Sequence, residues 1–404
     1  MKRIFSNKEI VLGVTGSIAA YKACEIASRL VEYGAHVLPV LTESAAELVA
    51  PASFEAITGR RAITKMFEPL ENPEIEHIAV ATRASLFLIA PATANVLAKA
   101  AHGIADDWLT TTLLATRAPI LFAPAMNCNM YTHPATHENI QTLARRGCRF
   151  VGPEEGRLAC GATGIGRMID PAAVIEACVP LLGTRKDLAG KKVLITSGAN
   201  HEPIDPVRFI GNRSSGKMGR AIALEALARG AEVTIISGPS EVRMPWGATV
   251  VSVRSAAEMA QAVEREAPNA DVIIGAAAVA DYRVENPAAD KIKREKDKLT
   301  LTLVQNPDII AAVAAKRRAG QVIVGFAAET ENLIPNAIEK LKRKNLDLIV
   351  ANLVGTPESD FGTDTVSASL ITPDRHIEDL PVVTKEELAE HVFNHIAQAL
   401  AQGG

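Results

Sequence analysis

Short apolar runs alternate with helix-like segments along the whole chain, and this alternation constrains the fold most. The runs are residues 10–14, 35–41, 86–90, 120–123 and 149–151, then 192–196, 232–237, 249–253, 272–276, 322–326 and 346–350. Residues 17–33 and 215–229 have the apolar spacing of helices. Strands that alternate with helices form parallel sheets covered on both faces. The sequence therefore predicts two doubly wound, Rossmann-like α/β domains with ligand sites at the carboxyl ends of the strands.

The boundary between these domains is predicted at the weakly patterned stretch 182–190. The chain has 404 residues, of which 48% are hydrophobic and 22% charged, which is ordinary for a globular protein and sufficient for two cores. We therefore expect one domain at residues 1–189 and a second at residues 190–404.

Charge and composition argue against nucleic-acid and membrane partners. The net charge is −3, only 4% of residues are aromatic and no basic block occurs, whereas nucleic-acid surfaces need clustered cations and stacking rings. The longest apolar stretch, residues 84–98, is interrupted by Pro91 and falls short of the ~20 residues of a membrane span. A signal peptide is rejected because residues 10–14 match a first strand.

Cysteine usage bears on the compartment. The five cysteines form no C-x-x-C pair and are odd in number: Cys24, Cys128, Cys148, Cys160 and Cys178. Such a set suits reduced thiols better than a disulfide framework or a zinc site. We expect a cytoplasmic protein.

A long polar loop separates the strand at 192–196 from the helix at 215–229. Its polar side chains, with those of the first helical turn, suit a phosphorylated acidic ligand: Asn200, His201, Asp205, Arg208, Asn212, Arg213, Ser214, Ser215 and Lys217. Residues 211–217 match G-x-x-x-x-G-K, but Met218 stands where a P-loop needs Ser or Thr. We predict instead that backbone N–H groups and the following helix start face an anion.

The loops of the first half carry a second set of candidates. Gly16 gives a tight turn after the first strand, and Ser17 is placed to cap the next helix. The fingerprint G-x-G-x-x-G is absent there, which disfavours NAD. Thr93, Asn95 and Asn127 follow later strands, and Cys160 lies between small residues.

These segments resemble the flavin-dependent cysteine decarboxylases. Residues 91–96 match the P-A-S-A-N-T motif, residues 124–131 match P-x-M-N-x-x-M-W, and His77 lies in IEHIAV. Thr93, Val96 and Tyr131 depart from the motifs. The resemblance implies an N-terminal flavoprotein of the cysteine decarboxylase type.

The resemblance also implies residue roles. His77 would act in oxidative decarboxylation, Asn127 and Met130 would hold the substrate, and Cys160 would protonate the enethiolate. A structural histidine and an inert packed cysteine are the plain alternatives. The cofactor would be FMN, bound by Gly16, Ser17, Ile18, Thr42, Ser44, Thr93, Ala94 and Asn95.

The second half resembles phosphopantothenate-cysteine ligases. The similar segments are residues 197–219, 280–293, 305–310, 325–330 and 340–352. Residues 276–298 are polar and lysine-rich after an apolar strand, as expected of a flap that carries Lys291 and Lys293. With the first half, the resemblance covers nearly the whole chain and is to the bifunctional phosphopantothenoylcysteine decarboxylase/phosphopantothenate-cysteine ligases of coenzyme A synthesis.

The ligase resemblance implies CTP as co-substrate and an acyl-cytidylate intermediate. Mg²⁺ would be bound with CTP, and no side chain is assigned to it. Arg208 and Asn212 would bind phosphopantothenate, and Asn212 and Lys291 would be catalytic. The CTP residues would be Gly275, Ala276, Ala277, Asp281, Lys291, Pro307, Asp308, Ile309, Ile310, Phe326, Lys340 and Lys344. Lys340 and Lys344 could equally belong to a solvated basic helix face.

Other hypotheses stay open at this point. The alternation alone also suits a nicotinamide-dependent oxidoreductase, and a decarboxylase-like domain could be a non-catalytic flavin-binding regulator. Two histidine pairs, 133/137 and 391/395, have zinc-ligand spacing but lack a third ligand, and we expect the second pair on the surface of a C-terminal helix.

The resemblance further implies a homo-oligomer. Trimeric decarboxylase units would be joined through ligase dimers, and a dodecamer would combine the two symmetries. The partners would be small molecules, namely phosphopantothenate, cysteine and CTP, with no nucleic acid and no membrane.

Overall fold

The computed structural model describes residues 1–66, 76–159, 161, 163–294, 298–329, 331–353 and 362–402. It divides into two compact units, Met1–Thr184 (unit 1) and Arg185–Gly404 (unit 2). Residues just after Thr184 attach to unit 2: Lys186 Nζ donates to Ala228 O (3.0 Å), and Leu188 is buried in the unit 2 core. The division therefore falls five residues before the expected boundary at 189.

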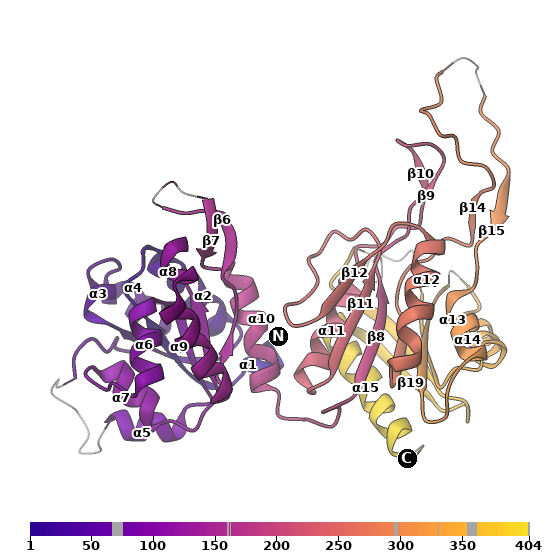
Figure 1. The fold of residues 1–404 in the computed structure, drawn as a ribbon. Coiled ribbons are helices and arrows are strands. Elements are labelled where there is room, and N and C mark those ends of the chain that lie inside the picture. The colour runs from indigo at the N-terminus through magenta and orange to yellow at the C-terminus, as the bar shows by residue number, and fades with distance from the viewer. Residues whose placement is uncertain are drawn as a thin grey trace. The chain divides into compact units, whose positions relative to one another are not determined.

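Unit 1 contains a five-stranded parallel sheet, as predicted (Figure 1). Its order is β2-β1-β3-β4-β5, and every pairing in it is parallel. The strands are β1 (Glu9–Val14), β2 (His36–Leu41), β3 (Leu86–Ala92), β4 (Ile120–Pro124) and β5 (Arg149–Phe150). The strand order reverses between β1 and β3, which is where doubly wound sheets bind ligands.

Helices cover both faces of this sheet. One core joins sheet residues such as Val11 and Phe87 to Leu97, Leu109 and Leu143 on α6, α7 and α9. Helices α2 and α10 pack together on the other strand faces. The helices are α1 (Lys2–Phe5), η1 (Ile18–Ala20), α2 (Tyr21–Glu32), α3 (Glu43–Ala46), α4 (Pro51–Thr58), α5 (Glu76–Arg83), α6 (Ala94–His102), α7 (Trp108–Ala115), α8 (Cys128–Thr132), α9 (Pro134–Arg145) and α10 (Pro171–Leu182).

Unit 1 also contains an antiparallel hairpin that the sequence did not predict. It pairs β6 (Glu154–Arg157) with β7 (Thr163–Arg167). The hairpin is attached to the loop after β4, because Met126 N donates to Gly166 O (2.9 Å). The sequences of its strands, EEGR and TGIGR, contain Ile165 as their one large apolar residue, which gives little apolar signal.

Unit 2 contains an eight-stranded sheet in the order β12-β11-β8-β13-β16-β17-β18-β19. The pairings from β12 to β17 are parallel, as predicted, whereas β18 and β19 extend the sheet antiparallel. The strands are β8 (Lys192–Ser197), β11 (Glu232–Ser237), β12 (Thr249–Ser252), β13 (Val272–Gly275), β16 (Val322–Glu329), β17 (Leu348–Leu353), β18 (Thr365–Ile371) and β19 (Ile377–Thr384).

Two apolar cores sandwich the unit 2 sheet. One contains Ile222 of α11 and Phe393 of α15, and the other contains Met259, Val313 and Leu341 of α12, α13 and α14. The helices are α11 (Lys217–Ala228), α12 (Ala256–Glu266), η2 (Ala267–Asn269), α13 (Ile309–Ala315), α14 (Leu333–Arg343) and α15 (Lys385–Gln402). Across the described part of the chain, no helix combines the length and apolar character that membrane crossing requires.

Two short antiparallel pairs stand on the loops of unit 2 (Figure 1). The pair β9 (Glu202–Pro203) and β10 (Phe209–Ile210) lies within the long polar loop. The pair β14 (Tyr282–Val284) and β15 (Leu303–Gln305) forms the base of the predicted flap. The polar loop begins at the carboxyl end of β8 and the flap at the carboxyl end of β13. The polar residues of both segments therefore lie beside one edge of the sheet.

Candidate active sites

The loops after β1 and β3 are tied together at the carboxyl edge of the unit 1 sheet. Thr15 is buried, and its hydroxyl donates to Pro91 O (2.7 Å) and accepts from Thr93 N (3.0 Å). One side chain thus fixes the loop of Gly16 and Ser17 against the loop of Thr93. The sequence analysis missed Thr15, although its place directly before Gly16 at a strand end could have signalled it.

Gly16 and Ser44 bring the loops after β1 and β2 into contact. A Cβ built on Gly16 would lie 2.5 Å from the Cβ of Ser44, so only glycine permits this approach. The predicted flavin residues from three loops therefore share one edge of the sheet.

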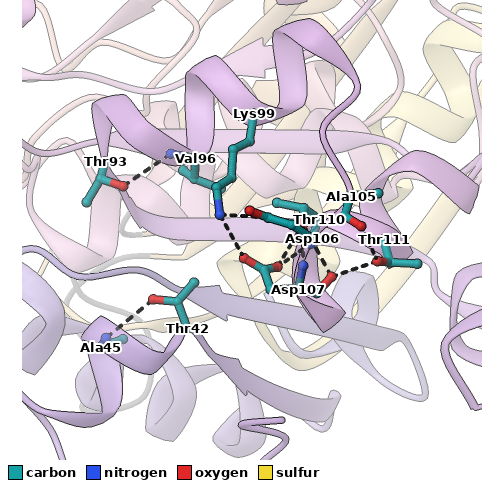
Figure 2. A network of polar contacts seen from close by, with 10 residues as sticks. All are labelled: Thr42, Ala45, Thr93, Val96, Lys99, Ala105, Asp106, Asp107, Thr110 and Thr111. Carbon is teal, nitrogen blue, oxygen red and sulfur yellow. Dashed lines mark hydrogen bonds and ion pairs between the residues drawn. The ribbon is translucent and has the colours of Figure 1, made fainter. Parts of the chain in front are cut away.

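Three predicted hydroxyls cap helices at this edge. Ser17, Thr42 and Thr93 accept hydrogen bonds from Ala19 N, Ala45 N and Val96 N, respectively. Figure 2 shows the caps formed by Thr42 and Thr93 on separate helices. Ala94 and Asn95 begin α6, a nine-residue helix whose first-turn N–H groups face outward from the cap.

A charged network connects α6 to α7. Lys99 Nζ lies 2.7 Å from Asp106 Oδ1 and 3.4 Å from Asp107 Oδ2 (Figure 2). Asp107 also caps α7 by accepting from Thr110 N (2.8 Å). The hydrogen bond to Asp106 raises the pKa of Lys99 and outweighs the opposing effect of burial. The network therefore joins the last turn of α6 to the start of α7.

The predicted substrate residues of unit 1 lie after β4. Asn127 caps α8 by accepting from Asn129 N (2.8 Å), and the side chain of Met130 is 49% exposed. Cys160 lies outside the described residues. Because Met126 N donates to Gly166 O (2.9 Å), β7 is anchored beside Asn127.

His77 stands apart from this cluster. It is half-buried in α5, and within the described residues it makes no hydrogen bond or ion pair with the loops that carry Thr93 or Asn127. In the part of unit 1 that the structure describes, His77 is therefore not joined to Thr93 or Asn127 by a hydrogen bond or an ion pair.

Unit 2 contains a cavity of about 650 Å³ at the carboxyl ends of β8, β13 and β16. Most of the predicted ligase residues line it: Asn212, Gly275, Ala276, Ala277, Asp281, Pro307, Asp308, Ile309, Ile310, Phe326, Lys340 and Lys344. These residues come from distant parts of the sequence, and the fold collects them in one place.

Three amide side chains and a hydroxyl hold the segment after β13, which lines the cavity. Asn200 is fully buried and its Oδ1 accepts from Ala280 N (2.7 Å), while Asn212 Nδ2 donates to Val279 O (3.0 Å). Asn306 Nδ2 donates to Ala280 O (2.8 Å), and Thr196 Oγ1 accepts from Ala277 N. The sequence analysis missed Thr196 and Asn306, and only the tertiary structure shows that they hold this segment.

Lys340 and Lys344 line the cavity rather than a solvated face. Lys340 pairs with Glu329, and Lys344 Nζ lies 2.9 Å from Asp308 Oδ2. Burial raises the pKa of Glu329 and of Asp308, but their bonds to the two lysines outweigh it and both pKa values are lowered. Each lysine therefore already has a carboxylate partner.

Arg208 and Lys291 do not line this cavity. Arg208 binds Asp205, and Arg208 Nη2 donates to Ile292 O (2.8 Å). The Asp205 carboxylate also accepts from Val207 N (2.8 Å) and Ile292 N (3.2 Å), and its pKa is lowered chiefly by the bond from Arg208. The flap is thus fixed to the polar loop one residue beyond Lys291, which is exposed.

The histidine pairs have structural partners. His391 Nδ1 and His395 Nε2 each lie 2.7 Å from the Glu378 carboxylate. The expected surface position is wrong for His395, whose side chain is only 14% exposed. His133 accepts from Ala135 N as the cap of α9. Among the described residues, no group of three or more His, Cys, Asp or Glu side chains could hold a metal ion.

Together the fold and the two sites define a two-domain α/β enzyme of small-molecule metabolism. Residues 2–183 match the family model described as Flavoprotein, and residues 188–400 match the DNA/pantothenate metabolism flavoprotein C-terminal domain. The chain is 44% identical over 397 residues to the coenzyme A biosynthesis bifunctional protein CoaBC of Vibrio cholerae, covering 98% of this chain and 99% of that protein.

Two further proteins are similar to this chain. The Escherichia coli K12 protein of the same name is 42% identical over 394 residues, covering 97% of each chain. A crystal structure of the C-terminal domain of CoaBC is 37% identical, covers 54% of this chain and 99% of that chain, and has a TM-score of 0.47. The chain belongs to the family of bifunctional coenzyme A biosynthesis enzymes, with a flavoprotein decarboxylase domain followed by a ligase domain. Nothing in these comparisons supports the nicotinamide oxidoreductase or the non-catalytic regulator.

Proposed function

We propose that unit 2 joins cysteine to 4′-phosphopantothenate with CTP, and that unit 1 decarboxylates the product to phosphopantetheine with FMN. The observation that supports the ligase most is the cavity of about 650 Å³, which collects Asn212 and most of the predicted nucleotide residues. Its volume lies within the range of about 300–1,000 Å³ that is usual for small-molecule sites.

The ligation needs an activated carboxyl group, because a free carboxylate has a poor leaving group. Transfer of CMP from CTP to the phosphopantothenate carboxylate forms an acyl-cytidylate and releases pyrophosphate. The cysteine amine then attacks the acyl carbon, the amide forms and CMP leaves. Mg²⁺ bound with CTP would offset the triphosphate charge.

In this reaction Asn212 would contact the acyl-cytidylate from the cavity wall. Lys291 would reach the phosphates from the flap, and Arg208 would bind phosphopantothenate from the polar loop. The Asp205 contacts that join the flap to this loop support a shared role of Lys291 and Arg208. The backbone of residues 275–277 and of residues 307–310 would frame the nucleotide, with Asp281 and Phe326 beside it.

Decarboxylation needs an electron sink that the cysteinyl carboxylate lacks. FMN would supply it by accepting a hydride from the substrate and later returning it. His77 would act in the oxidative decarboxylation, and Asn127 and Met130 would hold the substrate. Cys160 would protonate the enethiolate during its reduction.

The residues at the unit 1 edge fit FMN. Hydroxyl groups of Ser17, Thr42 and Thr93 and the first-turn N–H groups of α6 offer donors for the cofactor phosphate. Ile18, with 64% of its side chain exposed, offers an apolar surface for the ring system. The close approach of Gly16 to Ser44 keeps these groups together.

We further propose a cytoplasmic homo-oligomer with trimeric decarboxylase and dimeric ligase units, combined in a dodecamer. In the trimer, His77 of one copy would complete the Asn127 site of its neighbour, which accounts for its separation from the cluster within one chain. Subunits carrying His77→Asn, mixed with subunits carrying Asn127→Asp, should recover part of the CO2 release that each variant lacks alone. If oligomers that are verified to contain both kinds of subunit recover no CO2 release, both residues act within one copy.

The direct test incubates the purified protein with phosphopantothenate, cysteine and Mg²⁺, with CTP or ATP in parallel, and resolves the products by mass. We expect phosphopantetheine and CMP with CTP. Product that stops at phosphopantothenoylcysteine would support the ligase and count against the decarboxylase. No product with either nucleotide would sink the ligase proposal.

Single substitutions then separate the steps. Asn212→Asp should slow attack on the acyl-cytidylate, so this intermediate should accumulate. His77→Asn should abolish CO2 release while the protein still binds FMN. Cys160→Ala should still release CO2 but form phosphopantetheine slowly.

A further inference from the structure

Four lysines line the unit 2 cavity: Lys217, Lys340, Lys344 and Lys385. Lys340 and Lys344 are paired with Glu329 and Asp308, whose side chains are only 15% and 44% exposed. If either lysine turned to a new anion, its carboxylate would lose this partner. The other two lysines differ in their partners.

Lys217 has a partner that faces water. Its Nζ lies 2.7 Å from Asp364 Oδ1 and 2.7 Å from Gly362 O, and the Asp364 side chain is 85% exposed. An exposed carboxylate is readily solvated when its partner leaves, and ion pairs of this kind contribute little to stability. Lys217 can therefore exchange this partner at low cost.

The backbone that carries Lys217 is fixed at the cavity edge. Gly216 has φ +78°, and a Cβ there would lie 2.1 Å from Ser240 Oγ, so the turn before Lys217 packs tightly on the loop after β11. A Cβ on Gly219 would likewise meet Ser197 Oγ at 2.1 Å. The Cα of Lys217 thus stays in place while its long side chain can change partners.

The segment that holds Asp364 is anchored independently of Lys217. Lys385 Nζ donates to Thr363 O, and Lys385 N donates to Asp364 O (3.0 Å). Release of Lys217 from Asp364 would leave these bonds intact. Asp364 therefore behaves as a stationary competitor for the Lys217 ammonium group.

We propose that Lys217 is a triphosphate-binding residue of the ligase site and that Asp364 occupies its ammonium group until the nucleotide arrives. This inference rests on the proposed CTP-dependent ligase. A triphosphate carries several negative charges, so it competes well with one exposed carboxylate for the same cation. Binding then moves the Lys217 side chain from Asp364 to the phosphates, beside the first-turn N–H groups of α11.

The test measures pyrophosphate release at varied CTP for the full-length protein and its variants. Lys217→Met should raise KM for CTP about tenfold with a smaller change in kcat, because the contact forms on nucleotide binding. Asp364→Asn should lower KM for CTP about twofold, because the competitor is weakened. The double variant should match Lys217→Met, since Asp364 acts only through Lys217.

Lys316→Met is the matched control. Lys316 pairs with Glu264, both side chains are well exposed, and neither residue lines the cavity. Its KM for CTP should stay at the wild-type value. Melting of each variant without ligand separates binding from folding, and Asp364→Asn carries the test alone if Lys217→Met misfolds.

Several outcomes would overturn the inference. An unchanged KM for CTP in Lys217→Met would do so, as would a selective rise in KM for phosphopantothenate. Asp364→Asn raising KM as strongly as Lys217→Met would mark the pair as structural. In each of these outcomes the wild-type protein still forms product, so only the inference about Lys217 fails. If the ligase proposal itself is wrong, the wild-type protein forms no nucleotide-dependent product.

Discussion

In unit 2 most of the predicted nucleotide residues line one cavity, whereas in unit 1 the predicted residues lie on separate loops and His77 makes no described polar contact with them. The cavity of unit 2 is lined by strand ends and by the segment after β13, which the buried Asn200 holds through Ala280 N. The unit 1 edge instead leaves apolar side chains such as Ile18 and Met130 exposed. A site enclosed by one chain can be recognised as a cavity in that chain, whereas a site shared between copies appears only as an incomplete surface.

Asn200→Ala is expected to give the largest difference between its effects on unit 2 and on unit 1. Asn200 is fully buried and bonds Ala280 N and the Glu202 carboxylate, so its loss leaves buried groups without partners. We expect unit 2 to lose about 2–4 kcal/mol of stability and the ligase to lose its activity. Calorimetry and separate assays of the two reactions measure this. Loss of decarboxylase activity to the same extent would contradict the independence of the units.

The corresponding change in unit 1 is Gly16→Ala. The new Cβ would clash with Ser44, and overpacking of this kind costs about 1–3 kcal/mol. Flavin affinity should therefore fall about tenfold or more, while ligase turnover stays unchanged. Flavin absorbance after dialysis measures retention. Adding Ser44→Gly should restore part of it, and no recovery would show that contact with Ser44 is not the cause.

A smaller effect would sharpen the account of the flap. Asp205→Asn weakens the bonds to Arg208 and Ile292 that fix the flap, so trypsin should cleave faster after Lys291 and Lys293. Ligase kcat should fall several-fold with the FMN reaction unaffected. Asp290→Asn, an exposed change in the same flap, is the control. Equal cleavage rates in both variants would exclude Asp205 as the anchor.

The smallest effect concerns β19, the strand at one edge of the unit 2 sheet. Burial raises the pKa of Glu378, but hydrogen bonds from His395 and His391 outweigh it, so the folded pKa is lowered. This stabilisation is present above the ordinary carboxyl pKa, near 4.5, and is lost as the pH falls through the lowered value. Glu378→Gln should therefore cost about 1 kcal/mol at pH 7 and progressively less below about pH 4.5.

Denaturant unfolding of unit 2 across this pH range measures the effect. Glu232→Gln, an exposed change at the start of β11, serves as the control. A stability difference between Glu378→Gln and the wild type that is independent of pH would assign the loss to packing rather than to charge.

The parallel strands could be predicted because buried strands of an α/β fold carry continuous branched apolar runs. The sequence analysis predicted neither β18 nor β19. β19 exposes most of its residues and has only Leu380 buried among them, so it carries no continuous apolar run. The β6–β7 hairpin was missed for the same reason. Sequence motifs predicted most of the residues that line the unit 2 cavity. The sequence analysis missed Thr15, Thr196 and Asn306, because isolated polar residues form no pattern until the chain folds around them.

The sequence by itself determined two α/β domains, the parallel strands and the segments that follow them, because apolar periodicity and helix caps are local properties of the chain. Only the tertiary structure decided that Lys340 and Lys344 have carboxylate partners, that Lys217 contacts Asp364, and that Asp205 fixes the flap. These contacts join residues far apart in sequence. Their energies depend on distance, burial and competing partners, and none of these exists before the strands pack together.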